Sequence, residues 1–279
     1  MARRQAVRRE EASAVPAGEI EVSRPAAGVL LVTLARPERR NSLSQAMLTA
    51  LQEAIDAAER ERGVRCVVIA ARGPAFCAGH DLKELTAHRS DADGGAAFTQ
   101  ALMARCSAFM QSIVRCPKPV IAAVQGIASA AGCQLVATCD LAVASAAASF
   151  CTPGVNIGLF CSTPMVALSR NVPRKRAMEM LLTGEVLGAR EAAEYGLVNR
   201  VVAPERLAEE TLALAQLVAS KPAHTVALGK AAFYRQLEAG LTEAYDLASQ
   251  VMCRNMLHEE AREGIGAFLD KRPPDWSKT

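Results

Sequence analysis

The sequence lacks the features that would assign it to several large classes of protein. No apolar run approaches the ~20 residues of a membrane-spanning helix, so we expect no membrane partner. A net charge of +3 is too small to predict a nucleic-acid partner. There is no C-x-x-C pair, the four histidines are scattered, and no glycine-rich loop has the spacing of a phosphate-binding motif. We therefore expect neither a metal site nor a nucleotide-binding loop.

What is present is typical of a globular protein. The chain has 279 residues, of which 51% are hydrophobic and 22% charged, enough for one large domain or two small ones. The nine cysteines lie mostly in apolar runs, which indicates buried, reduced thiols and a cytoplasmic location. Residues 1–18 contain four arginines, followed by Glu10 and Glu11 with no apolar segment. We predict a disordered tail there, with an organellar presequence as the alternative.

Short apolar runs that alternate with helical patterns predict an α/β fold. Runs suited to buried parallel strands cover residues 29–34, 66–71, 120–124 and 141–143. Ser42 or Ser44 can cap a helix that ends near Glu61, and Asp81 with Glu84 has the spacing of a capping pair for the next one. Strands and helices in this order favour parallel pairing with right-handed crossovers.

The last third of the chain is mainly helical. Helices are expected near residues 174–183, 189–195, 205–220, 222–236, 241–254 and 256–269, with one strand near 198–202. No linker separates these helices from the rest of the chain. We therefore predict a core over residues 19–203, followed by a helical lid or assembly region over 204–279 rather than an independent domain.

Two segments, about fifty residues apart, place small residues just before a helix. They are Ala78-Gly79-His80 and Ser129-Ala130-Ala131-Gly132. A helix N-terminus has unpaired N–H groups, and its dipole favours negative charge. The N–H groups of His80 and Ala131 are therefore candidates to bind one ligand oxygen together, as an oxyanion hole does. The alternative is that the small residues only allow close packing of helix on strand.

Seven segments in series resemble the crotonase, or enoyl-CoA hydratase/isomerase, superfamily. They are residues 36–43, 76–85, 117–122, 126–140, 182–184, 189–201 and 267–272. Their order and spacing match that superfamily over about residues 20–275. Residues 78–85 and 151–164 further resemble one particular branch of it.

The resemblance implies a crotonase-like spiral of ββα units with a C-terminal helical trimerisation region. It also implies a homotrimer or a dimer of trimers that acts on acyl-CoA thioesters. Coenzyme A would arrive as part of the substrate, so no separate cofactor is expected. The oxyanion donors would be the N–H groups of His80 and Ala131. The coenzyme A contacts would fall on Arg36, Arg40, Ala78, Asp81, Leu82 and Lys83, and on Phe268 and Lys271 of a neighbouring subunit.

The sequence departs from the superfamily at the two positions that matter most for hydration. Hydratases of this kind use two glutamates as base and acid, and these align with Gln134 and Gly154. Gln134 can hold a water molecule but cannot take its proton, and Gly154 has no side chain. Isomerases usually keep the second acid, so ordinary isomerisation is disfavoured too. His80 is the strongest substitute, because an imidazole can titrate near neutral pH; the alternative is that His80 only serves packing.

Several functions fit these observations. The first is an acyl-CoA-processing enzyme with non-standard catalytic groups, for which decarboxylation and thioester hydrolysis both stay open. The second is a protein that binds acyl-CoA without turnover. RNA binding is disfavoured because the basic residues are dispersed outside the tail. Cys133, Cys151, Asn156, Cys161 and Ser162 are further candidates to line an acyl pocket, although buried cysteines are more often structural.

Overall fold

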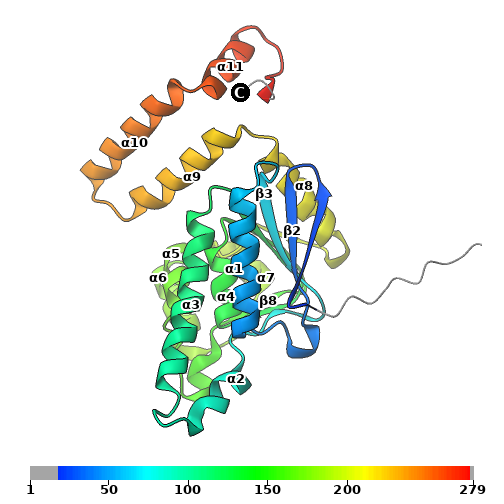
Figure 1. Cartoon of the computed structure of the whole chain (residues 1–279), viewed down its shortest axis with the longest axis vertical. Helices are drawn as coiled ribbons and strands as arrows, with labels where there is room; N and C mark the ends of the chain where they lie inside the picture. The colour runs from blue at the N-terminus through cyan, green and yellow to red at the C-terminus, as the bar shows by residue number, and fades with distance from the viewer. Residues whose placement is uncertain (1–17, 277–279) are drawn as a thin grey trace, which may run out of the picture.

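In a computed structural model, residues 18–276 are described, and they form two β-sheets and eleven α-helices (Figure 1). The α/β class predicted from the sequence is confirmed. Apart from Gly18, the predicted tail over residues 1–18 lies outside the described residues. Within the described part, no helix is long and apolar enough to cross a bilayer.

The larger sheet contains the strands that the apolar runs predict. Its six strands lie in the order β1 (Ile20–Ala26), β2 (Val29–Leu34), β3 (Cys66–Ala71), β5 (Val120–Val124), β7 (Leu141–Ser145) and β10 (Arg200–Val202). β1 and β2 form an antiparallel hairpin, and every later neighbour pairs in parallel. The hairpin strand β1 was not predicted from the sequence.

A second, smaller sheet was not predicted at all. It consists of β4 (Ala75–Cys77), β6 (Ile127–Ser129), β8 (Ser149–Cys151) and β9 (Leu187–Gly188), in that order. β4, β6 and β8 run parallel, and β9 pairs antiparallel with β8. From β3 to β8 the chain alternates between the sheets, giving one strand to each before it continues into helix. This alternation is the predicted spiral of ββα units.

The helices follow the predicted pattern closely. They are α1 (Gln45–Arg60), α2 (Leu82–Ala87), α3 (Ala96–Arg115), α4 (Ala131–Thr138), α5 (Pro164–Asn171), α6 (Arg174–Thr183), α7 (Ala189–Glu194), α8 (Leu207–Ala219), α9 (Ala223–Leu237), α10 (Leu241–Met256) and α11 (Glu259–Leu269). The helix α5 was not predicted from the sequence. Short 3-10 turns cover Pro37–Arg39, His88–Ser90, Pro153–Ile157 and Pro204–Arg206.

The larger sheet is covered on both faces, which explains its continuous apolar runs. One face packs with α1 and α3 in the main core, to which α1 contributes Leu48, Leu51 and Ile55, as its periodicity predicts. The other face packs against α8 in a smaller core. In β3, for example, Val67 belongs to the first core and Val68 to the second.

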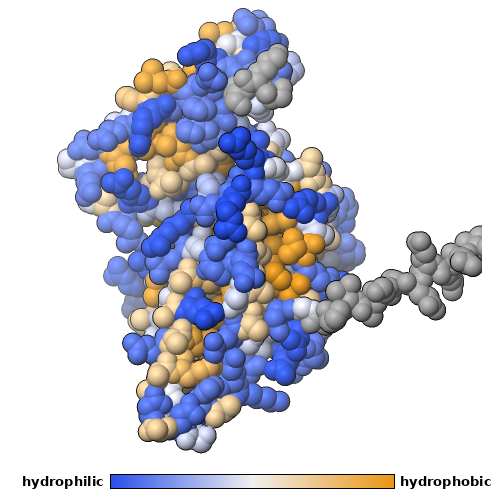
Figure 2. Space-filling view, in the orientation of Figure 1, coloured by the Kyte–Doolittle hydropathy of each residue, from blue (hydrophilic) through white to orange (hydrophobic). Residues whose placement is uncertain are grey.

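The last three helices form an arm that extends beyond the sheets (Figure 1). No residue of α9 or α10 is buried. Hydrophobic surface is visible on this arm at the top left of Figure 2, and its exposed apolar residues include Phe233, Leu237, Tyr245, Met252 and Leu257. So much exposed apolar surface is typical of a protein–protein contact.

One buried network attaches the arm to the core. The Lys230 ammonium of α9 lies 2.6 Å from the Asp140 carboxylate, which follows α4. Tyr234 donates a 2.8 Å hydrogen bond to the same carboxylate. Lys230 also donates to the carbonyl oxygens of Ile113 and Lys118. Asp140 is therefore a structural residue, and it fixes α9 against the end of α3.

Candidate functional site

Three loops follow three neighbouring parallel strands of the smaller sheet. Ala78–His80 follows β4, Ala130–Ala131 follows β6, and Thr152–Gly154 follows β8. Because carboxyl ends of parallel strands meet at one edge of a sheet, these loops lie together. The sequence indicated the first two loops as candidate ligand-binding turns. It indicated the third loop only through Gly154, which aligns with the second glutamate of the hydratases. The sheet that brings them together is the one that the sequence did not reveal.

The first loop is held by hydrogen bonds to the turn that follows β2. The Ala78 N–H donates to the Arg40 carbonyl at 3.0 Å, and the Leu43 N–H donates to the Gly79 carbonyl at 2.8 Å. Gly79 has φ of +95°, a conformation that glycine adopts without strain. The Asn41 side chain supports the neighbouring turn, since it accepts from the Arg36 N–H and donates to two backbone carbonyls.

The second loop touches the first. A Cβ built on Gly79 would lie 3.1 Å from the Cβ of Ala130 and 3.5 Å from the backbone nitrogen of Ala131. Gly132 packs even closer to β4, because a Cβ there would lie 2.1 Å from the Cys77 carbonyl oxygen. The small residues therefore allow close packing of helix on strand, as the alternative interpretation predicts. The same packing also places the two loops side by side.

The two N–H groups proposed as oxyanion donors are available. Neither the His80 N–H nor the Ala131 N–H donates a backbone hydrogen bond within residues 18–276. Ala131 is the first residue of α4, whose eight residues are all buried. Its N–H therefore lies at a buried helix N-terminus, where an anionic oxygen is favoured.

Ala130 adopts a conformation that is rare for alanine, with φ of +50° and ψ of −115°. Such a conformation costs about 1–3 kcal/mol of strain.

We expect Ala130→Gly to stabilise the fold by about 1 kcal/mol, once the greater conformational entropy of glycine in the unfolded chain is subtracted. Thermal unfolding should then show a Tm higher by about 2–4 °C. Ala128→Gly, in the neighbouring strand β6, is the matched control and should lower the Tm; an equal decrease in both variants would contradict the strain at Ala130.

His80 has one ring nitrogen engaged and one free. Its Nδ1 lies 3.3 Å from the Leu43 carbonyl oxygen, which can only accept, so Nδ1 carries the proton. Its Nε2 is buried and has no hydrogen-bond partner among the described residues. Burial lowers the pKa of the imidazole, and the bond to Leu43 only partly opposes this effect. The ring is therefore neutral at pH 7 and presents a lone pair on Nε2.

Gln134 and Gly154 lie on the second and third loops or directly after them. Gln134 is buried one turn into α4, and its Oε1 has no partner among the described residues. Gly154 is buried in the 3-10 turn after β8. A Cβ on Gly154 would lie 2.9 Å from the Leu159 carbonyl oxygen and 3.0 Å from the Cys161 Sγ. The space beside Gly154 is therefore filled by its neighbours, and no carboxylate fits there without a shift of residues 159–161.

The residues predicted to contact coenzyme A fall into two groups, one near the first loop and one at the end of the arm. Lys83 and Leu82 are exposed at the start of α2, next to Ala78, and Arg40 is exposed in the adjoining turn. Arg36 is already paired with Glu19 and Glu38.

Asp81 acts as the N-cap of α2. Its carboxylate accepts from the N–H groups of Lys83 and Glu84 and lies 3.4 Å from Arg39. The predicted capping pair is only half right, because the Glu84 side chain accepts from the Gln45 N–H at the start of α1 instead. Asp81 and Glu84 thus join the starts of two helices. For Asp81, desolvation raises the pKa, but the two backbone bonds and Arg39 outweigh it, so the pKa is lowered overall.

Phe268 lies in the last turn of α11 and Lys271 two residues beyond this helix. Figure 1 shows α11 at the opposite end of the molecule from α2, which follows the first loop. The Phe268 side chain is 82% exposed. The structure of one chain therefore does not bring these two residues to the site. Their predicted role in a neighbouring subunit stays a prediction.

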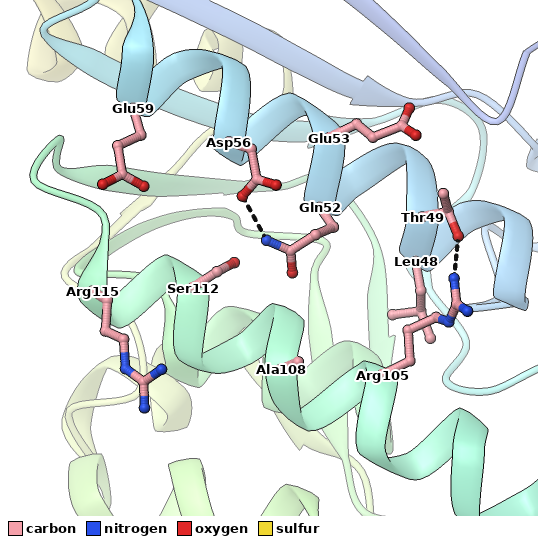
Figure 3. Close-up of a pocket in the computed structure, with 10 residues that line it drawn as sticks. All are labelled: Leu48, Thr49, Gln52, Glu53, Asp56, Glu59, Arg105, Ala108, Ser112 and Arg115. Atoms are coloured by element: carbon pink, nitrogen blue, oxygen red, sulfur yellow. Dashed lines mark hydrogen bonds between the residues drawn. The ribbon is translucent and has the colours of Figure 1, made fainter.

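A groove of about 580 Å³ between α1 and α3 is separate from this site (Figure 3). Asp56 and Glu59 of α1 line it on one side, and Arg105 and Arg115 of α3 line it on the other. Arg105 donates to the Thr49 hydroxyl at 2.6 Å. None of the predicted site residues lines this groove, and its carboxylates would repel the phosphates of coenzyme A.

The cysteines and other titratable groups add no metal site. All nine cysteines are free thiols, eight of them buried, and Cys253 alone is exposed. Burial raises the pKa of Cys77 to about 12. Within the described residues, no group of three His, Cys, Asp or Glu side chains is placed to hold a metal ion.

Comparisons with known proteins confirm the predicted resemblance. A family model described as enoyl-CoA hydratase/isomerase matches residues 24–279. The mitochondrial enoyl-CoA hydratase domain-containing protein 3 of Rattus norvegicus is 48% identical over 270 residues, which cover 95% of this chain and 88% of the rat protein. The human protein of the same name is 50% identical over 250 residues, which cover 90% of this chain and 81% of the human protein.

Solved structures agree with these relatives. The crystal structure of an enoyl-CoA hydratase from Mycobacterium smegmatis has a TM-score of 0.88 and 52% identity, and the match covers 93% of this chain and 99% of the other. The human enoyl coenzyme A hydratase domain-containing protein 3 also has a TM-score of 0.88, with 48% identity over 92% of this chain and all of the other. The branch suggested by residues 78–85 and 151–164 is thereby confirmed.

The cytoplasmic location predicted from the cysteines is contradicted. The rat, mouse and human relatives are all named mitochondrial. Reduced, buried thiols do not distinguish the cytosol from the mitochondrial interior, which is why the cysteine pattern gave the wrong compartment. The alternative, an organellar presequence, falls on the N-terminal residues outside the described part of the chain.

Proposed function

Because the chain belongs to the enoyl-CoA hydratase/isomerase family, we propose that it is an acyl-CoA-processing enzyme that stabilises a thioester enolate. The observation that supports this proposal best is the contact between the loops of His80 and Ala131, with both N–H groups unpaired. A mitochondrial location is part of the proposal and rests on the names of the relatives.

The chemistry starts at the thioester carbonyl oxygen. Removing a proton, or CO₂, from the α-carbon moves negative charge onto this oxygen. Two N–H donors, one of them at the N-terminus of α4, stabilise that charge without needing to reorient. Each such donor contributes on the order of 3 kcal/mol to catalysis in known enzymes.

His80 is the group best placed to take the proton. The free Nε2 lone pair belongs to the residue whose N–H serves as one donor. Gln134 can position the substrate or a water molecule but cannot act as a base. Standard two-glutamate hydration is therefore not the proposed reaction, whereas enolate formation, decarboxylation and thioester hydrolysis do not need the missing pair.

The remaining predicted parts belong to the same proposal. Lys83 and Arg40 would hold phosphates of coenzyme A at the open side of the first loop. A homotrimer, or a dimer of trimers, would cover the exposed apolar surface of the arm. Lys271 and Phe268 of one subunit would then reach the coenzyme A bound to the next. Residues 19–203 would form the catalytic core and 204–279 the assembly region.

Deuterium exchange at the α-carbon of butanoyl-CoA tests this function without assuming the final reaction. Enolate formation replaces α-hydrogens with deuterium in D₂O, and mass spectrometry follows it. Ala131→Pro removes one donor at the first helical position, where proline is tolerated. We expect it to slow the exchange by about 10²–10³-fold.

Leu241→Pro is the matched control, because Leu241 is the first residue of α10 and is 77% exposed. It should leave the exchange rate unchanged. If the wild-type protein binds butanoyl-CoA but catalyses no exchange, and converts no member of a panel of acyl-CoAs, the enzyme proposal fails. The alternative, binding without turnover, would then hold.

A further inference from the structure

Thr152 is buried at the start of the third loop, and its hydroxyl is unused. It occupies the N-cap of the 3-10 turn Pro153–Ile157 but makes no side-chain cap hydrogen bond. Threonine at an N-cap normally accepts from an N–H group two or three residues later. Its Oγ1 has no partner among the described residues, although the residue is fully buried.

Cys161 explains why the hydroxyl is free. The Cys161 Sγ lies 3.0 Å from the position that a Cβ of Gly154 would take, so the thiol fills the space beside Gly154. Burial raises the pKa of this thiol, and the nearby Gly154 N–H opposes that effect. The thiol thus lies beside the N–H that Thr152 would otherwise bind, and the Thr152 hydroxyl is left to face a different partner.

The position of Thr152 connects it to the oxyanion donors. The carbonyl of the preceding residue, Cys151, accepts the Ala130 N–H at 2.9 Å. Gln134 lies one turn above Ala130 in α4, with its N–H bonded to the Ala130 carbonyl. His80 follows Gly79, which touches Ala130.

Three buried side-chain atoms without a hydrogen-bond partner therefore belong to residues next to the turn at Ala130. They are Thr152 Oγ1, Gln134 Oε1 and His80 Nε2, and the described chain has only two other buried side-chain atoms without a partner, Gln125 Oε1 and Thr211 Oγ1. A buried polar group without a partner is unfavourable, so such groups gather where a ligand supplies the missing hydrogen bonds. An alkyl chain alone would leave all three unpaired.

We propose that Thr152 is a substrate-contacting residue whose hydroxyl binds an uncharged polar group, a hydroxyl on C2 or C3 of the acyl chain. This proposal rests on the proposed function. A ligand hydroxyl can accept from Thr152 and donate to Gln134 Oε1 or His80 Nε2.

Binding of three thioesters that differ only in one hydroxyl group tests the proposal. Affinities of butanoyl-CoA, 2-hydroxybutanoyl-CoA and 3-hydroxybutanoyl-CoA are measured by isothermal titration calorimetry with the full-length protein. We expect one hydroxylated thioester to bind about tenfold more tightly than butanoyl-CoA, equivalent to about 1.4 kcal/mol. Thr152→Val, which keeps the shape and removes the hydroxyl, should abolish this ratio, and Thr152→Ser should restore it.

Thr211→Val is the matched control, because Thr211 is also buried with an unpaired hydroxyl but belongs to α8, on the other face of the larger sheet. It should leave the ratio at its wild-type value. A wild-type ratio near one, or a ratio kept in Thr152→Val, would overturn the role of Thr152 while leaving thioester binding intact. If no thioester binds at all, it is the proposed function that fails.

Discussion

The wild-type protein should hydrate crotonyl-CoA at least ~10⁴-fold more slowly than a family hydratase that has both glutamates. Each general acid or base is typically worth 10²–10⁴-fold. By the resemblance, the two glutamates align with Gln134, which cannot act as a base, and with Gly154, which has no side chain. Loss of the conjugated thioester absorbance, followed with enzyme in large excess, measures the residual rate.

Gln134→Glu should raise that rate by about 10²-fold or more, because it restores one of the two groups. Gln111→Glu makes the same exchange on the exposed face of α3 and should change nothing. A glutamate at position 154 is a poor partner for this experiment, because even its Cβ would clash with residues 159–161. Wild-type hydration at a rate normal for the family would show that other groups perform both proton transfers.

Replacing Lys230 by methionine should lower the free energy of unfolding by about 3–5 kcal/mol. The Lys230 side chain is 7% exposed and the Asp140 side chain 15%, so the change leaves a nearly buried carboxylate without its cation. The Val120 N–H and the Tyr234 hydroxyl still donate to Asp140 but bring no compensating full charge. Urea unfolding measures the loss.

Two controls distinguish the effect of leaving a buried charge unpaired from a general effect of substitutions on the stability of the arm. Arg170→Met removes an exposed ion pair between α5 and Glu238, just after α9, and should cost at most about 1 kcal/mol. The double variant Lys230→Met/Asp140→Asn removes both buried charges and should recover part of the stability. Equal losses for Lys230→Met and Arg170→Met would contradict the importance of the buried network.

Elements could be predicted from the sequence where they have a continuous apolar run or a helical period. The run Val120–Val124 and the helix Arg174–Thr183 were placed at their observed bounds. The strands of the smaller sheet could not, because β4, β6 and β8 have three residues each and β9 two. So few residues show no period, and only pairing with distant segments makes them strands.

The same limit applies to the candidate site. His80 and Ala131 could be located because small residues before a helix leave a local pattern. Thr152 could not, because its unused hydroxyl and the Cys161 thiol beside Gly154 are features of the folded chain alone. A threonine before Pro153 even suggests an ordinary cap, which is the opposite of what the structure has.

The alternation of the chain between two sheets has a consequence for how such a protein can diverge. Each turn of the spiral delivers one loop to the edge where β4, β6 and β8 end. The first two turns carry the N–H groups that we propose as the two donors, and no side-chain substitution removes a backbone N–H except proline. The third carries Thr152 and Gly154, where a substitution changes a side-chain group rather than a backbone donor. Altering the third turn alone could therefore change the reaction, while the two proposed N–H donors stay in place.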